Sequence, residues 1–60
     1  MTVEEYYAAV RRMNLHPTNV PTVYRTPGGD LYNVPLGSGL SATGRAEMIE
    51  ILKRELGLTP

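Results

Sequence analysis

The side chain best suited to acid–base chemistry is His16, the one histidine of the 60-residue chain, because an imidazole normally titrates near neutral pH. Catalysis needs a neighbouring carboxylate, thiol or second imidazole to orient such a group, and the residues beside His16 in sequence supply none. The chain has no cysteine, which excludes disulfides, thiolate nucleophiles, and zinc sites of the finger or ribbon type. We therefore expect His16 to lie in a loop, and we expect no catalytic residue, no metal and no cofactor.

A second candidate is an anion site at the start of an expected helix. Gly37, Ser38 and Gly39 lead to Ser41, a natural N-cap, and Arg45 follows one helical turn later. Free backbone amides at a helix start, with a guanidinium nearby, could hold a phosphate or a carboxylate. The spacing differs from a Walker motif, which needs Gly-Lys followed by Ser or Thr, so a flexible connection is the favoured interpretation.

A third candidate is a surface for nucleic acid, in which Arg11, Arg12 and Arg25 contact phosphates. The aromatic residues that could stack on bases are Tyr6, Tyr7, Tyr24 and Tyr32. Six basic residues balance six acidic ones, however, so the net charge of zero does not indicate a polyanion partner. Because the chain has neither Phe nor Trp, some tyrosines must fill the core, and RNA is kept as the alternative partner.

A helix is expected at the N-terminus, where Thr2 and Glu5 have the spacing of a capping box. Asn14 is a plausible left-handed stop and Pro17 disfavours helical geometry before it, so this helix should end near Met13 or Asn14. Its apolar stripe consists of Val3, Tyr6, Tyr7, Val10 and Met13.

Two β-prone runs follow, residues 20–26 and 31–36, separated by Pro27-Gly28-Gly29. The glycines suit a type II turn or a type I turn with a bulge. If Thr26 and Asp30 close the loop, Tyr24 faces Tyr32 across the hairpin.

A second helix is expected from Ser41, its N-cap, to Gly57, which with Leu58 indicates a Schellman stop. Glu50 precedes Arg54 by four residues, the favourable order for an ion pair. The apolar stripe consists of Ala46, Ile49, Leu52 and Leu56.

These elements predict a single α+β domain over residues 1–60, in the order helix, β-hairpin, helix (α-β-β-α), with both helices packed on one face of a small antiparallel sheet. A lone hairpin is marginal in water, and its open edges are templates for another strand. We therefore expect a homodimer or a protein partner, with an interface that uses the hairpin edges. The exposed apolar residues expected there are Val23, Leu36, Leu40 and Leu58.

Three segments carry a resemblance to a known family: Val-Tyr-Arg-Thr-Pro-Gly-Gly at 23–29, Tyr-Asn-Val-Pro at 32–35, and the helix end at 51–58. Together with the element order, they resemble the HicA-type toxins, which have a double-stranded-RNA-binding-like fold. That family carries a Gly-Ser-His element on its first strand, whereas the corresponding residues 19–22 here contain no histidine, and His16 does not match the motif. The resemblance implies the fold and an RNA-related role in a bacterial or phage toxin–antitoxin system, without the nuclease chemistry.

The leading hypothesis is a non-catalytic protein-binding module or accessory subunit, which self-associates or docks to a larger protein through its hairpin edge. The alternative is a HicA-like RNA-interacting protein, and an enzyme that uses His16 comes third. No apolar run approaches the roughly 18 residues of a membrane span, so we expect a cytoplasmic protein without a membrane partner.

Overall fold

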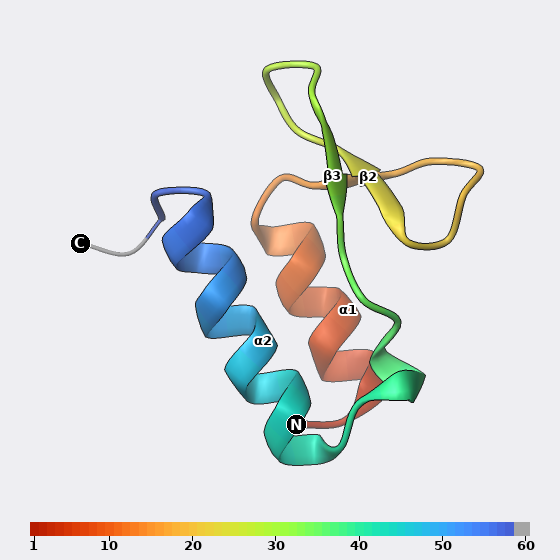
Figure 1. Ribbon diagram of the computed structural model, residues 1–60, viewed down its shortest axis with the longest axis vertical. Coiled ribbons are helices and arrows are strands. Elements are labelled where there is room, and N and C mark those ends of the chain that lie inside the picture. The colour runs from red at the N-terminus through yellow and green to blue at the C-terminus, as the bar shows by residue number, and fades with distance from the viewer. Residues whose placement is uncertain (59–60) are drawn as a thin grey trace.

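The computed structural model describes residues 1–58, which form two helices, three short strands and one 3-10 turn. Their order confirms the predicted α+β class with helix, strands and helix in succession (Figure 1). The elements are α1 (Val3–Arg12), β1 (His16–Pro17), β2 (Val23–Arg25), β3 (Leu31–Asn33), η1 (Gly37–Gly39) and α2 (Ala42–Glu55).

Helix α1 begins and ends as the sequence predicts. The Thr2 hydroxyl accepts a hydrogen bond from Glu5 N–H at 3.1 Å, and Thr2 N–H donates to the Glu5 carboxylate at 2.7 Å. Hydrogen bonding of the Glu5 carboxylate, first to the backbone N–H of Thr2 and then to its hydroxyl, lowers the pKa of Glu5 below its ordinary value. At the other end Asn14 has φ of 62° and donates its N–H to Arg11 C=O at 3.0 Å, which confirms the left-handed stop.

The sheet has one strand more than the sequence pattern predicts. Residues His16 and Pro17 pair antiparallel with β2, His16 opposite Arg25 and Pro17 opposite Tyr24. Thr18 extends this contact, because its N–H and its hydroxyl both donate to Val23 C=O, at 3.3 and 2.7 Å. The expectation that both hairpin edges are open is therefore wrong, since β1 covers the β2 edge. His16 lies on this strand and not in a loop.

The register of the β2–β3 hairpin is the predicted one. Tyr24 lies opposite Tyr32, and Val34 N–H donates to Thr22 C=O at 2.8 Å. Tyr24 belongs to the buried core and Tyr32 packs against it. The sheet face that carries both tyrosines is thus the face turned toward the helices.

The turn between β2 and β3 is one of the two predicted turn types. Thr26 N–H donates to Asp30 C=O at 2.8 Å, and Gly29 N–H donates to Thr26 C=O at 2.9 Å. Gly29 has φ of 90°, whereas Gly28 lacks the positive φ that a type II turn would need. The loop is therefore a type I turn followed by a left-handed glycine at the bulge position.

Helix α2 is also capped as predicted. The Ser41 hydroxyl accepts from Gly44 N–H at 3.0 Å. At the C-terminus Gly57 has φ of 72° and Leu58 N–H donates to Lys53 C=O at 2.8 Å, which is the Schellman pattern.

The predicted ion pair between Glu50 and Arg54 is wrong, since the Glu50 carboxylate lies 3.4 Å from the Lys53 ammonium instead. Residues three apart on a helix are as close as residues four apart, so both pairings are sterically available. Ala46, counted in the apolar stripe of this helix, is exposed.

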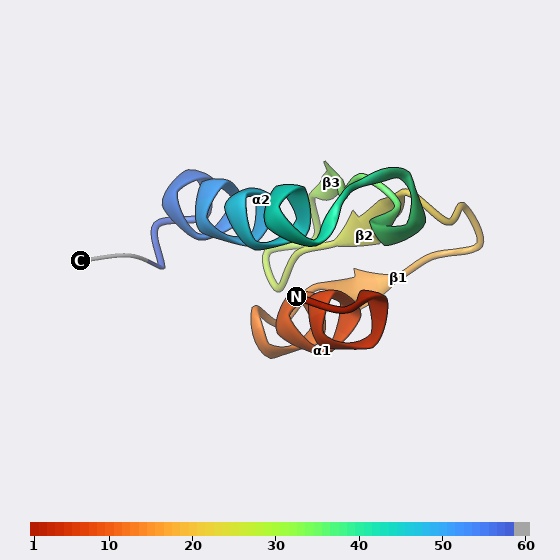
Figure 2. The same cartoon turned by 90° about the horizontal axis from the view of Figure 1, so that it is seen from below.

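The core lies where the two helices meet the sheet. Its buried side chains are Tyr6, Val10, Met13, Leu15, Tyr24, Val34, Ile49 and Leu52. The sheet lies beside the C-terminal end of α1, and η1 lies beside the N-terminal end of this helix (Figure 1). Figure 2 shows α1 and β1 in one layer and α2 and β3 in the other. The molecule measures 31 × 29 × 14 Å along its principal axes.

Within residues 1–58, neither helix combines the length and the apolar character that crossing a bilayer requires.

Candidate functional site

The outer edge of β3 is the first feature that could bind another molecule. Val34 N–H donates to Thr22 C=O, and Tyr32 lies opposite Tyr24. Tyr32 and Val34 therefore direct their backbone N–H and C=O groups toward β2. In an antiparallel pair, alternate residues direct N–H and C=O to the same neighbour. Leu31 and Asn33 therefore direct theirs away from β2. We call these backbone groups of Leu31 and Asn33 the outer edge of β3.

The opposite edge of the sheet, formed by β1, is built differently. Thr18 N–H donates to Val23 C=O and His16 lies opposite Arg25, so His16 and Thr18 face β2 while Pro17 faces outward. Proline has no N–H, so this edge lacks a donor where an added strand would need one. Proteins commonly protect edge strands with proline or with charged side chains. The segment Leu31–Asn33 contains neither.

The sheet face turned away from the helices adjoins this outer edge. Strand alternation places on it Val23, Arg25, Leu31 and Asn33, with His16 beside Arg25. We call these five residues the open face. Leu31 is 64% exposed, more than any other large hydrophobic residue described, and it stands directly at the outer edge. Apolar and hydrogen-bonding groups thus occur side by side on β3.

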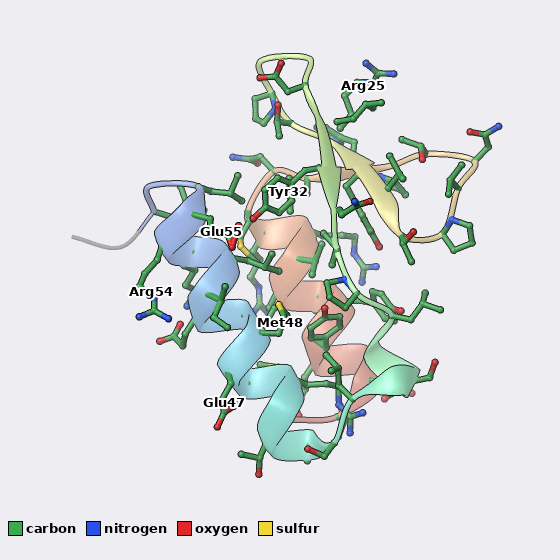
Figure 3. The ribbon with its side chains drawn as sticks, viewed as in Figure 1. Arg25, Tyr32, Glu47, Met48, Arg54 and Glu55 are labelled. Carbon is green, nitrogen blue, oxygen red and sulfur yellow. The ribbon has the colours of Figure 1, made fainter. Side chains whose placement is uncertain are left out.

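Figure 3 shows the opposite directions of two side chains of the hairpin, Tyr32 toward Glu55 and Arg25 away from the helices. Tyr32 Oη donates to the Glu55 carboxylate at 2.5 Å. Burial, and then the hydrogen bond and charge of Glu55, raise the pKa of Tyr32 to about 12. Strand β3 is therefore fastened to α2 through its helix-facing side chain, which leaves the outer edge unobstructed by that contact.

Two backbone amides of the expected anion site, those of the two glycines, are engaged within the protein. Gly37 N–H donates to the Tyr7 hydroxyl at 2.9 Å, and Gly39 N–H donates to Leu36 C=O at 3.1 Å. Gly37 is buried, whereas Ser38 is exposed on a turn of only three residues. An anion would have to compete with these internal acceptors.

Arg45, the expected cation of that site, is engaged as well. Its Nε donates to Met1 C=O at 2.8 Å, and its Nη1 donates to Gly37 C=O at 2.8 Å and to Leu40 C=O at 2.6 Å. The guanidinium therefore joins the N-terminus, η1 and α2. We assign Arg45 the structural role of holding these three segments together.

The three arginines expected to contact nucleic acid lie on two different parts of the molecule. Arg11 and Arg12 are exposed in the last turn of α1, on the helix side of the sheet. Arg25 lies on the open face, and its Nη1 donates to Gly29 C=O at 3.2 Å. Its neighbour across the strands is His16, which is exposed. The structure brings Arg25 and His16 together, but not Arg25 with the α1 pair.

The four apolar residues expected at an interface do not form one surface. Val23 is half-buried on the open face, Leu40 is half-buried against the core, and Leu36 and Leu58 are exposed. Leu40 and Leu58 flank opposite ends of α2, whose 14 residues span about 21 Å. Sequence reasoning missed Leu31. The alternation rule would have found it, because placing Tyr32 toward the core places Leu31 outward.

Within residues 1–58, no three His, Cys, Asp or Glu side chains gather as a metal site would need. Comparison of the chain with family models, with curated proteins and with solved structures gave no match. The functional interpretation therefore rests on the geometry of the sheet.

Proposed function

We propose that this protein is a small binding module that takes up a strand of another polypeptide at the outer edge of β3. The observation that carries the proposal is the difference between the two sheet edges. Pro17 removes the donor from the β1 edge, whereas Leu31 and Asn33 direct their backbone groups outward from β3. In strand addition the main-chain hydrogen bonds supply affinity and the alternate side chains supply specificity.

The side chains beside the outer edge suit a protein partner. Leu31 is 64% exposed, and Asn33 is exposed two residues further on the same face. An incoming strand would cover Leu31 while it pairs with the backbone beneath it. Full burial of a leucine side chain contributes about 1.5–3 kcal/mol, and coverage of one flank by the added strand contributes a part of this beside the main-chain hydrogen bonds.

We infer a binding role and not a catalytic one from the surroundings of His16. Its neighbour across the strands is Arg25, whereas a catalytic imidazole is normally oriented by a carboxylate. Both side chains are exposed on the open face.

The experiment is affinity capture with three immobilised proteins, namely the wild type, Leu31→Lys and Leu58→Lys, from an extract of the native host and from a solution of a differently tagged copy. Leu58 is 52% exposed beyond α2, so its replacement is a matched control. We expect the wild type and Leu58→Lys to retain the same partner and Leu31→Lys to lose it. Equal recovery by all three proteins, or recovery by none, contradicts the proposal.

The alternative is RNA binding, which the position of Arg25 beside His16 on an exposed sheet face favours. Each phosphate contact releases counterions, so RNA affinity should fall steeply with salt, and Arg25→Ala should make that dependence shallower. An affinity that does not depend on salt excludes this alternative.

A further inference from the structure

We propose that the partner strand is β3 of a second copy of this chain, paired antiparallel about a two-fold axis that passes beside Tyr32. This inference rests on the proposed strand addition at the outer edge of β3, and it names the occupant and the register. The joined sheets would be continuous through the two β3 strands.

The hydrogen-bonding groups of the outer edge are complementary to themselves. With Tyr32 on the axis, Leu31 lies opposite Asn33 of the second copy, and Asn33 lies opposite Leu31 of that copy. Both residues direct N–H and C=O outward, so each pair exchanges a donor and an acceptor in both directions. Every outward backbone group of β3 is then used, and the reciprocal pairing of Leu31 with Asn33 is the self-complementary contact of a two-fold interface.

Neighbouring registers use these groups less completely. Moving the axis to Asn33 places Leu31 opposite Pro35, which has no N–H to offer. Moving it to Leu31 places Asn33 opposite Gly29, which lies in the turn with φ of 90°. A slip by a single residue would set helix-facing side chains against open-face side chains. The register with Tyr32 on the axis is the one in which both outward residues pair within strands.

Charge also favours a second copy. No residue of Leu31–Asn33 is charged, and the nearest charge, Asp30, would lie opposite Val34 of the second copy. The formal net charge of the chain is zero, so two copies approach without long-range repulsion. A domain of about 60 residues buries only about 60% of the surface that its unfolded chain exposes, and association is one way in which such a domain gains further burial.

Cysteine cross-linking tests the register directly, because the chain has no cysteine of its own. Two single variants, Leu31→Cys and Asn33→Cys, are mixed in equal amounts, oxidised and separated on a non-reducing gel. Opposite residues of an antiparallel pair have Cα atoms about 5.5 Å apart, within disulfide range. We expect the mixture to form the mixed dimer faster than either variant alone forms its own dimer. Cross-linking no faster than that of a Leu58→Cys control overturns the register.

Light scattering after size exclusion tests the assembly itself. The wild type and Leu58→Lys should shift from monomer to dimer as concentration rises, whereas Leu31→Lys should stay monomeric. In this register the two Leu31 side chains are diagonal neighbours, about 7–8 Å apart. Mixing Leu31→Lys with Leu31→Glu should therefore restore a dimer. Failure of the mixture to form any dimer contradicts the proposed arrangement.

The two proposals fail in different ways. A wild type that remains monomeric at every concentration overturns self-pairing, while strand addition stands if capture of a host protein is still lost with Leu31→Lys and kept with Leu58→Lys. If the wild type is monomeric and Leu31→Lys captures host proteins as well as the wild type does, both self-pairing and strand addition are overturned.

Discussion

Tyr32 Oη lies 2.5 Å from Oε2 of Glu55, to which it donates a hydrogen bond that joins β3 to the last turn of α2. The two residues are 23 positions apart in sequence, so this contact helps to close the sheet onto the helices. It acts on the helix-facing side of β3. The outer edge, made by Leu31 and Asn33, takes no part in this contact. The same short strand can therefore be anchored to α2 and still offer its outer edge to another strand.

Replacement of Tyr32 by Phe should destabilise the protein by about 1 kcal/mol at neutral pH, since it removes the hydrogen bond and keeps the ring. The pKa of Tyr32 is raised to about 12, above the ordinary value of about 10. Between these values the unfolded chain loses the phenol proton and the folded protein keeps it, so the free energy of unfolding falls as pH rises.

Urea unfolding of the wild type and Tyr32→Phe at neutral pH and at about pH 11 measures this dependence. The variant should lose less stability on the alkaline side than the wild type. Tyr32→Phe should still lose some stability at alkaline pH, because burial also raises the pKa of Tyr6 and of Tyr24. An identical alkaline loss in both proteins contradicts the assigned hydrogen bond.

Replacement of Gly37 by Ala should destabilise the protein by about 1–3 kcal/mol, because a Cβ atom there would lie 2.9 Å from Cδ2 of Tyr6. The Tyr6 ring is fully buried and its hydroxyl donates to Pro35 C=O at 2.7 Å, so it cannot move aside freely. Gly39→Ala is the control, since a Cβ atom at Gly39 meets no heavy atom within 4 Å. Thermal unfolding that ranks the two variants equally would be inconsistent with this packing.

Replacement of Arg45 by Lys should cost about 1.5 kcal/mol or more, although the charge is kept. A guanidinium can donate to the three carbonyls of Met1, Gly37 and Leu40 at once, whereas an ammonium on a flexible stem cannot hold all three in place. Arg54→Lys, at an exposed position of the same helix, should be close to neutral. Chemical unfolding measures the stability of both variants. Equal stabilities of Arg45→Lys and Arg54→Lys would argue against the structural role of Arg45.

Replacement of Leu52 by Ala should cost about 2–5 kcal/mol, which can equal the whole stability of so small a domain. Leu52 is 2% exposed in the core, whereas Leu58, 52% exposed, should tolerate the same change. Circular dichroism during heating measures the melting of Leu52→Ala and of Leu58→Ala. Wild-type melting of Leu52→Ala would contradict the packing of α2 on the sheet.

The sequence predicts those parts of the fold that local chemistry determines. Thr2, Asn14, Ser41 and Gly57 each satisfy backbone groups at a helix end, and their residue types reveal that role without any tertiary information. The hairpin register follows from the turn residues and from the alternation that makes Tyr24 and Tyr32 neighbours.

The parts that the sequence does not predict depend on distant contacts. Strand β1 has two residues, too few for an alternation pattern, and it exists because Val23 and Arg25 direct their backbone groups to that side of β2. Arg45 has the spacing of an anion ligand, but its carbonyl partners lie up to 44 residues away in sequence. For the same reason the difference between the two sheet edges emerges only once β1 is in place.

Amide hydrogen exchange by NMR at increasing protein concentration tests most directly whether the outer edge of β3 pairs with β3 of a second copy. Tyr32 and Val34, whose backbone groups face β2, are internal references. We predict that the amides of Leu31 and Asn33 exchange fast in dilute solution and become protected as concentration rises, while the reference amides change little. Fast exchange of Leu31 and Asn33 at every concentration, beside protected reference amides, would contradict pairing of β3 with a second copy.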